Sequence, residues 1–179
     1  MKKVKFRFYL DHEKEEKWIN EMAGSGWHLK KFTLGRFTFE KGEPGTCIYR
    51  NEFISGMSND EKKDYFEFLK DSGITIVHEL GGWVYMKKDA ADGPFEIYTD
   101  TESKISYYKR MLNMFLFLFV LNAWLGFMNI SVFGNHTKIE FLNSAIGIFN
   151  VAAALLIAVP TIKIIRRKRE LNGKRQFFE

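Results

Sequence analysis

The chain has 179 residues, of which 46% are hydrophobic and 27% are charged, and its formal net charge is +5. This length supplies one core of ordinary size plus an attached segment. The lone cysteine, Cys47, excludes an internal disulfide, and no second Cys or patterned His accompanies it to form a metal site. The first residues include basic side chains but no apolar segment with a cleavage site, so we expect no signal peptide.

Residues 1–98 are predicted to form a duplicated α+β domain. Aligning "SGW" at 25–27 with "SGI" at 72–74 gives an offset of 47 residues. At this offset Trp18 matches Tyr65, and Gly35 matches Gly82. The two repeats cover about residues 4–41 and about residues 48–88. Both read as strand, helix, strand, strand.

Local signals mark the same boundaries in each repeat. The alternating strands "KFRFYL" and "IYRNEFI" lead into helices that begin at Asp11 and Ser58, and Glu61 completes a capping box with Ser58. Glycines follow both helices, and each repeat ends in a hairpin. The predicted helix stops and turns are Gly26, Gly73, Gly35, Gly81 and Gly82.

We expect the strands of both repeats to form one antiparallel sheet, with both helices on one face and the other face open or covered by a partner. In element order this resembles the duplicated modules of the gyrase-inhibitory-protein-like small-molecule-binding domains. That resemblance implies a ligand cleft between the two repeats.

Aromatic residues recur along the predicted strands, and they have two interpretations. They form the core of the sheet, or part of them lines a pocket or contacts a partner protein. Trp27, Trp83 and Tyr85 are the candidates for such a surface because they lie in or beside the predicted hairpins. The full set is Phe6, Phe8, Phe32, Phe37, Phe39, Tyr49, Phe53, Trp83 and Tyr85.

Two charge-free apolar stretches follow, each long enough to cross the hydrocarbon core of a bilayer. We predict a connector at 99–110, transmembrane helices at 111–133 and 141–162, an external loop at 134–140 and a basic tail at 163–179. The stretch "MLNMFLFLFVLNAWLGFMNISVF" is apolar on every side, as a lipid-facing helix is. Basic residues flank the pair on its outer ends, which predicts that both termini are cytoplasmic. The tail run "KIIRRKRELNGKR" is expected to lie against anionic lipid headgroups.

Both apolar stretches carry the pattern Asn, three residues, Gly, two residues, Asn. If the loop centres near His136, residues of the two patterns lie at equal depth. We predict that they form the seam of a helical hairpin, where small residues allow close approach and amides bond across the gap. Pairing of the same face between two chains in a homodimer, and chance, are the alternatives. The seam residues are Asn122, Gly126, Asn129, Asn143, Gly147 and Asn150.

The sequence contains no recognisable catalytic, cofactor-binding or metal-binding motif. His12, His28 and His78 are isolated from one another and lack metal-ligand spacing. The carboxylates near Glu15 alternate with lysines, as on a solvated helix face. Acidic residues stand among the basic ones on the strands, which disfavours nucleic-acid binding. We expect neither an enzyme nor a cofactor.

Four segments resemble a bacterial family, the domain of unknown function 2812: "EKEEKWINEMAGSGWHL", "FTFEKGEP", "YRNEF" and "EIYTDTESKISYYKR" before the transmembrane pair. Members of that family are often encoded beside a PadR-type transcriptional regulator. The resemblance implies a membrane-tethered regulatory or sensory protein that binds such a soluble partner, and it assigns no site residue. The alternative function is a module that captures small hydrophobic molecules at the membrane. The sequence does not identify the stimulus, the partner or the oligomeric state. It also does not decide whether the transmembrane hairpin acts as a switch or as a plain anchor.

Overall fold

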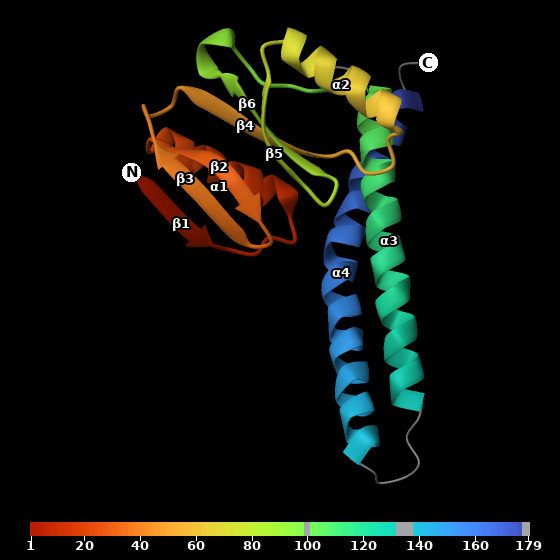
Figure 1. Ribbon diagram of the computed structural model, residues 1–179. Coiled ribbons are helices and arrows are strands. Elements are labelled where there is room, and N and C mark those ends of the chain that lie inside the picture. Colours follow the sequence, from red (N-terminus) through yellow and green to blue (C-terminus); the bar gives the residue numbers. More distant parts are fainter. Residues whose placement is uncertain (99–100, 132–137, 177–179) are drawn as a thin grey trace. The chain divides into compact units, whose positions relative to one another are not determined.

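The computed structural model describes residues 1–98, 101–131 and 138–176. It divides into two compact units, Met1–Thr99 and Asp100–Glu179. The first unit contains the strands and two short helices, and the second contains two long helices (Figure 1).

The first unit confirms the predicted α+β class and the order strand, helix, strand, strand in each repeat. The first repeat consists of β1 (Lys2–Phe6), α1 (His12–Gly24), β2 (Trp27–Thr33) and β3 (Arg36–Lys41). The second consists of β4 (Cys47–Phe53), α2 (Asn59–Asp71), β5 (Thr75–Leu80) and β6 (Trp83–Asp89), followed by the short 3-10 helix η1 (Ala90–Asp92).

The two repeats match in detail as well as in order. Both helices span 13 residues and are capped as predicted, by Asp11 and by the capping box of Ser58 with Glu61. Gly26 and Gly73 take left-handed φ values of 77° and 74° directly after the helices. Each second strand also carries an irregularity at the same place, between Leu29 and Lys31 in β2 and between Ile76 and His78 in β5.

The prediction of a single sheet is wrong, because each repeat forms its own three-stranded antiparallel sheet. The first sheet has the order β1-β3-β2, and the second has the order β4-β6-β5. The two sheets approach each other at the edge strands β2 and β5, and side chains of α1 cover the free edge of β4. The amide group of Asn20 donates to the carbonyl of Tyr49 and accepts from its N–H, at 2.9 and 2.8 Å. Glu16 Oε2 accepts from the N–H of Asn51 at 3.3 Å. Side chains of a helix thus bond backbone groups of β4 with which another strand could otherwise pair.

The two helices do not share one face of a common sheet, which also departs from the prediction. Trp18 of α1 packs edge-to-face against Phe37 and Phe39 of the first sheet, in a core that also contains Tyr49 and Tyr85 of the second. On the opposite face of the second sheet, a separate core is built around α2. Its buried members are Ile54, Leu69, Val84, Met86 and Phe95. Successive strand residues alternate between faces, so β6 serves both cores.

The second unit is a helical hairpin of α3 (Thr101–Ser131) and α4 (Lys138–Gln176). Both helices are longer than predicted: α3 includes most of the expected connector, and α4 continues into the expected tail. Residues 101–130 and 141–173 are long and apolar enough to be membrane spans. Many of their large side chains are exposed, including Phe117, Trp124 and Phe149. Most of the expected external loop, residues 134–137, lies outside the described residues.

Candidate functional site

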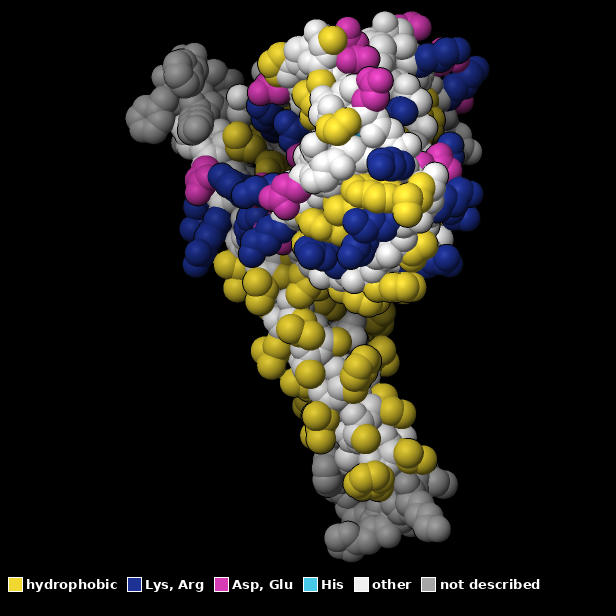
Figure 2. Space-filling model, turned by 90° about the vertical axis from the view of Figure 1, so that its left-hand side faces the viewer, with side chains coloured by type: hydrophobic (Ala, Val, Ile, Leu, Met, Phe, Trp, Pro, Cys, Tyr) yellow, Lys and Arg dark blue, Asp and Glu magenta, His cyan; other side chains and the backbone are white. Residues whose placement is uncertain are grey.

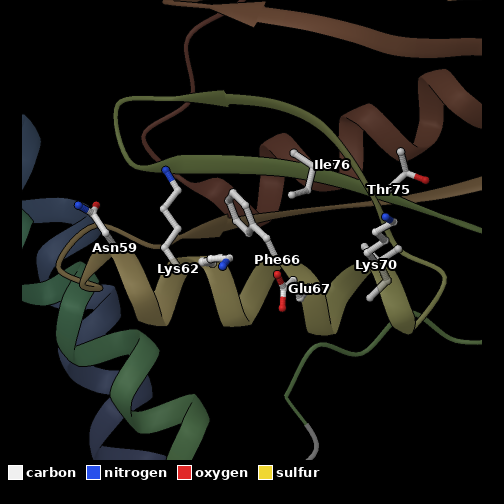
Figure 3. A pocket seen from close by; sticks show the side chains of 9 residues that line it. Asn59, Lys62, Phe66, Glu67, Lys70, Thr75 and Ile76 are labelled. Atoms are coloured by element: carbon white, nitrogen blue, oxygen red, sulfur yellow. The ribbon is translucent and has the colours of Figure 1, made fainter.

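A groove lies on the first unit between α2 and β5 (Figure 3). Its volume is about 720 Å³, within the usual range for small-ligand sites. Both walls come from the second repeat. The lining residues are Asn59, Lys62, Lys63, Phe66, Glu67, Lys70, Ile74, Thr75 and Ile76.

The floor of this groove is apolar, and its rim carries three lysines beside the carboxyl group of Glu67. Phe66, Ile74 and Ile76 are half-buried and belong to the core beneath α2. Phe66 projects from α2 toward β5, where Ile76 lies on the other side of the groove (Figure 3). The groove therefore offers a hydrocarbon surface bordered by ammonium groups.

Helical spacing explains the lysine rim. Lys63, Phe66 and Lys70 follow one another at intervals of three and four residues, which places them on one side of α2. Lys62 forms an ion pair with Glu79, and its ammonium group lies 5.4 Å from the centre of the Phe66 ring. Within the described residues, no ion pair involves Lys63 or Lys70. Two rim lysines are thus available to an anionic group.

The aromatic residues singled out from the sequence lie elsewhere in the unit. Trp27 and Trp83 are half-buried against the first core, where Lys3 Nζ lies 4.6 Å from the centre of the Trp27 ring. Trp83 packs beside Phe53 at a ring distance of 5.3 Å. Tyr85 is only 3% exposed, because its side chain points into the interior toward α1. Tyr85 cannot belong to a partner surface, and the three residues do not form one exposed patch.

A buried polar cluster joins α1 to the second sheet. Tyr85 and Asn51 both donate to Glu15 Oε1, at 2.5 and 3.5 Å. Beside them, Arg50 Nη1 lies 2.5 Å from Glu16 Oε1. Burial raises the pKa of both carboxyl groups above the ordinary value, although the hydrogen bonds and Arg50 act in the opposite direction. This cluster connects the two repeats and does not open into the groove.

In the second unit, the two predicted seam glycines meet. A Cβ atom on Gly126 would lie 3.3 Å from the carbonyl oxygen of Gly147, and one on Gly147 would lie 3.1 Å from Cβ of Asn129. The amides differ from expectation, because Asn122 and Asn129 donate to carbonyls of their own helix, at Leu118 and Leu125. Donation to the carbonyl four residues earlier satisfies an amide without a partner helix. Asn143 and Asn150 are half-buried on α4.

The groove was missed by sequence reasoning, although one signal for it exists. The lysines of α2 resemble those of any solvated helix face. Their distinguishing feature is a half-buried Phe66 between Lys63 and Lys70 on the same face. Only the position of β5 turns this face into the wall of a groove.

Comparison with protein families gave a match over much of the chain. The profile of the family described as "Protein of unknown function (DUF2812)" matches residues 11–120, which is more than half of the chain. No curated protein and no solved structure matched.

Proposed function

The chain belongs to the DUF2812 family, and from that premise we propose that it is a membrane-tethered regulatory or sensory protein that acts by binding, with no chemical step. The observation that supports this most is the groove between α2 and β5, where Lys63 and Lys70, which form no ion pair with any described residue, border an apolar floor. Such a groove suits a reversible contact with a molecule that is both apolar and anionic.

The first candidate for the occupant is an acidic amphipathic segment of a soluble partner, such as a PadR-type transcriptional regulator. An amphipathic helix can place its apolar face in a groove of this kind while its carboxylates reach the rim. Lys63 and Lys70 are seven residues apart, about 10 Å along the helix axis, so carboxylates two turns apart on the partner would meet both. Binding and release of the regulator would then depend on events at the membrane.

The second candidate is a small amphipathic anion, such as a molecule with one hydrocarbon chain and a carboxylate or phosphate head. The volume of the groove, about 720 Å³, favours this candidate because it falls in the small-ligand range. In this case the soluble unit would capture its ligand close to the bilayer.

The tether is the second part of the proposal. Two long apolar helices supply the spans, and basic residues at both outer ends favour cytoplasmic termini. Arg166, Arg167, Lys168 and Arg169 would lie next to the headgroups, where anionic lipid attracts them. A homodimer through the helical hairpin is compatible with this arrangement.

Binding of a PadR-type regulator from the same genome to the full chain in nanodiscs tests the first candidate. We expect Lys63→Glu combined with Lys70→Glu to weaken binding by at least about tenfold, since two attractive charges become repulsive. The matched control is Lys14→Glu with Lys17→Glu, which reverses two exposed charges on α1.

Native mass spectrometry of the same preparations tests the second candidate. A co-purifying amphiphile that is lost in the groove variant and kept in the control variant would support ligand binding. If neither the regulator nor any amphiphile distinguishes the two double variants, the groove is not the functional site.

A further inference from the structure

The uncovered face of the first sheet ends in an exposed apolar tip. Phe6, Phe8 and Leu34 are 72%, 80% and 83% exposed. In the register of the sheet, Phe6 of β1 lies opposite Arg36 of β3, and Val4 lies opposite Thr38. Phe37 and Phe39 point to the other face, into the core, so Phe6 and Arg36 point outward together.

Local packing holds the tip together. The N–H of Arg7 donates to the carbonyl of Gly35 at 2.8 Å, which continues the contact between β1 and the turn that joins β2 to β3. The Phe8 ring lies directly over Gly35, so close that a Cβ atom there would come within 2.5 Å of it. Leu34 is the neighbouring residue of the same turn. Phe8 and Leu34 therefore form one surface although they are 26 positions apart in the sequence.

Basic side chains surround this tip. Arg36 and Lys31 point outward from the same face, because they lie opposite Phe6 and Thr38 in the sheet. Among the described residues no ion pair involves Lys31 or Arg36. Glu40 lies further along β3, where it pairs with Lys2 and Lys30. Figure 2, viewed from the side on which β1 lies in Figure 1, shows hydrophobic and basic side chains interleaved on this unit.

We propose that this surface, the aromatic–basic face of Phe6, Phe8, Leu34, Lys31 and Arg36, docks on an anionic lipid surface. Apolar side chains at a single tip can enter the headgroup region, while the surrounding cations remain with the lipid phosphates. The inference is separate from the groove, which lies in the other repeat. It rests on the proposed function only in that the tether would keep the unit near a bilayer.

The charge of the surface favours lipid over a protein partner as the occupant. The three apolar side chains are each at least 72% exposed, and the described residues form no ion pair with Lys31 or Arg36. A lipid surface needs no matching shape and presents negative charge at any orientation. A protein partner that used this surface would have to supply acidic groups around a complementary apolar site.

The experiment uses the full chain in a Cys47→Ser background, with an environment-sensitive fluorophore on Leu34→Cys. A second protein carries the fluorophore on Phe68→Cys, an exposed apolar position on α2. Both proteins are placed in nanodiscs made either of phosphatidylcholine alone or of phosphatidylcholine with phosphatidylserine. We expect the Leu34 probe to shift to shorter wavelength in the anionic nanodiscs and the Phe68 probe to keep its spectrum. Lys31→Ser with Arg36→Ser should abolish the shift.

Equal spectra for the Leu34 probe in both kinds of nanodisc would overturn the inference while leaving the tether intact. Failure of the chain to enter nanodiscs would instead contradict the tether. In that case the same labelled proteins are mixed with phosphatidylserine vesicles, where a shift at Leu34 alone supports docking and its absence refutes it. A shift that appears only when a soluble protein is added would assign the face to a protein partner and would also overturn the inference.

Discussion

The hydroxyl group of Tyr85 donates a 2.5 Å hydrogen bond to Oε1 of Glu15, so β6 of the second repeat binds a carboxyl group on α1 of the first. Both residues are buried, and Asn51 donates to the same oxygen. Burial raises the pKa of Glu15, and burial together with the nearby carboxylate raises the pKa of Tyr85. This contact helps to make one folding unit of two repeats that form separate sheets.

The raised pKa of Glu15 predicts a pH-dependent stability. As the pH rises past the ordinary carboxyl pKa, the unfolded chain loses its proton before the folded chain does, so stability is lost until the folded pKa is passed. Glu15→Gln keeps an acceptor for Tyr85 but cannot ionise. We therefore expect the melting temperature of the parent to fall relative to that of the variant as the pH rises above about 4, the ordinary carboxyl pKa.

The control for this experiment is Glu21→Gln, because Glu21 is an exposed carboxyl group on the same helix. Glu16 contributes its own pH dependence equally to all three proteins, so the difference between parent and variant isolates Glu15. Parallel melting curves for the parent and Glu15→Gln across this range would mean that the buried carboxyl group does not titrate as its surroundings predict.

Residues 1–98 are expected to fold alone, and Trp18 is expected to be essential for their stability. This unit contains both cores, and Trp18 lies 5.0 and 5.5 Å from the ring centres of Phe37 and Phe39. Trp18→Ala should lower the free energy of unfolding by about 3–5 kcal/mol. Tyr65→Ala should fall near or below the lower end of this range, because Tyr65 is half-buried. Urea denaturation measures both, and an unchanged midpoint for Trp18→Ala would contradict the assigned core.

Close contact at the helical hairpin predicts that Gly126 does not tolerate a side chain. A Cβ atom there would lie 2.7 Å from Cγ2 of Val151 and 3.2 Å from its backbone nitrogen. Gly126→Ala should therefore destabilise the hairpin by about 1–3 kcal/mol, as overpacking does. Gly173→Ala is the matched control, since a Cβ atom on Gly173 meets nothing within 4 Å. Thermal unfolding in one detergent compares the variants, and equal losses at both positions would exclude a packed seam.

The proposed topology predicts that a reporter active only in the cytoplasm works when it is fused at Met1 or at Glu179. The physical reason is the excess of basic residues at both outer ends of the helical pair. Glu179 itself lies outside the described residues. An external location of the fusion at Glu179 would contradict a two-pass chain with both ends inside.

Much of the fold follows from local signals in the sequence. Asp11 and Ser58 mark the starts of the helices, and Gly26 and Gly73 mark their ends because few other residues adopt a left-handed φ. The covering of the β4 edge by α1 could not be predicted, because Asn20 has an ordinary helical surface position in the sequence. Its hydrogen bonds to the edge of β4 exist only in the folded chain.

The candidate sites were harder to predict than the fold. Tyr85 resembles a surface aromatic on an alternating strand, but its ring packs 4.9 Å from that of Phe32 in the first core, and its hydroxyl group binds Glu15 on a distant helix. Similarly, Asn122 resembles an interhelical amide, but it donates to the carbonyl of Leu118 in its own helix. The groove depends on where β5 lies beside α2, and that information is not local.

Photo-crosslinking from the groove tests the central claim, that this protein acts by binding there, most directly. A p-benzoylphenylalanine residue replaces Phe66, which lines the groove, or Phe68, which is exposed on α2 and does not line it. Both proteins are irradiated in living cells and their adducts are identified by mass spectrometry. The account predicts an adduct at position 66 with a PadR-type regulator or an amphipathic anion, and no such adduct at position 68. Identical adducts at both positions, or none at position 66, would contradict it.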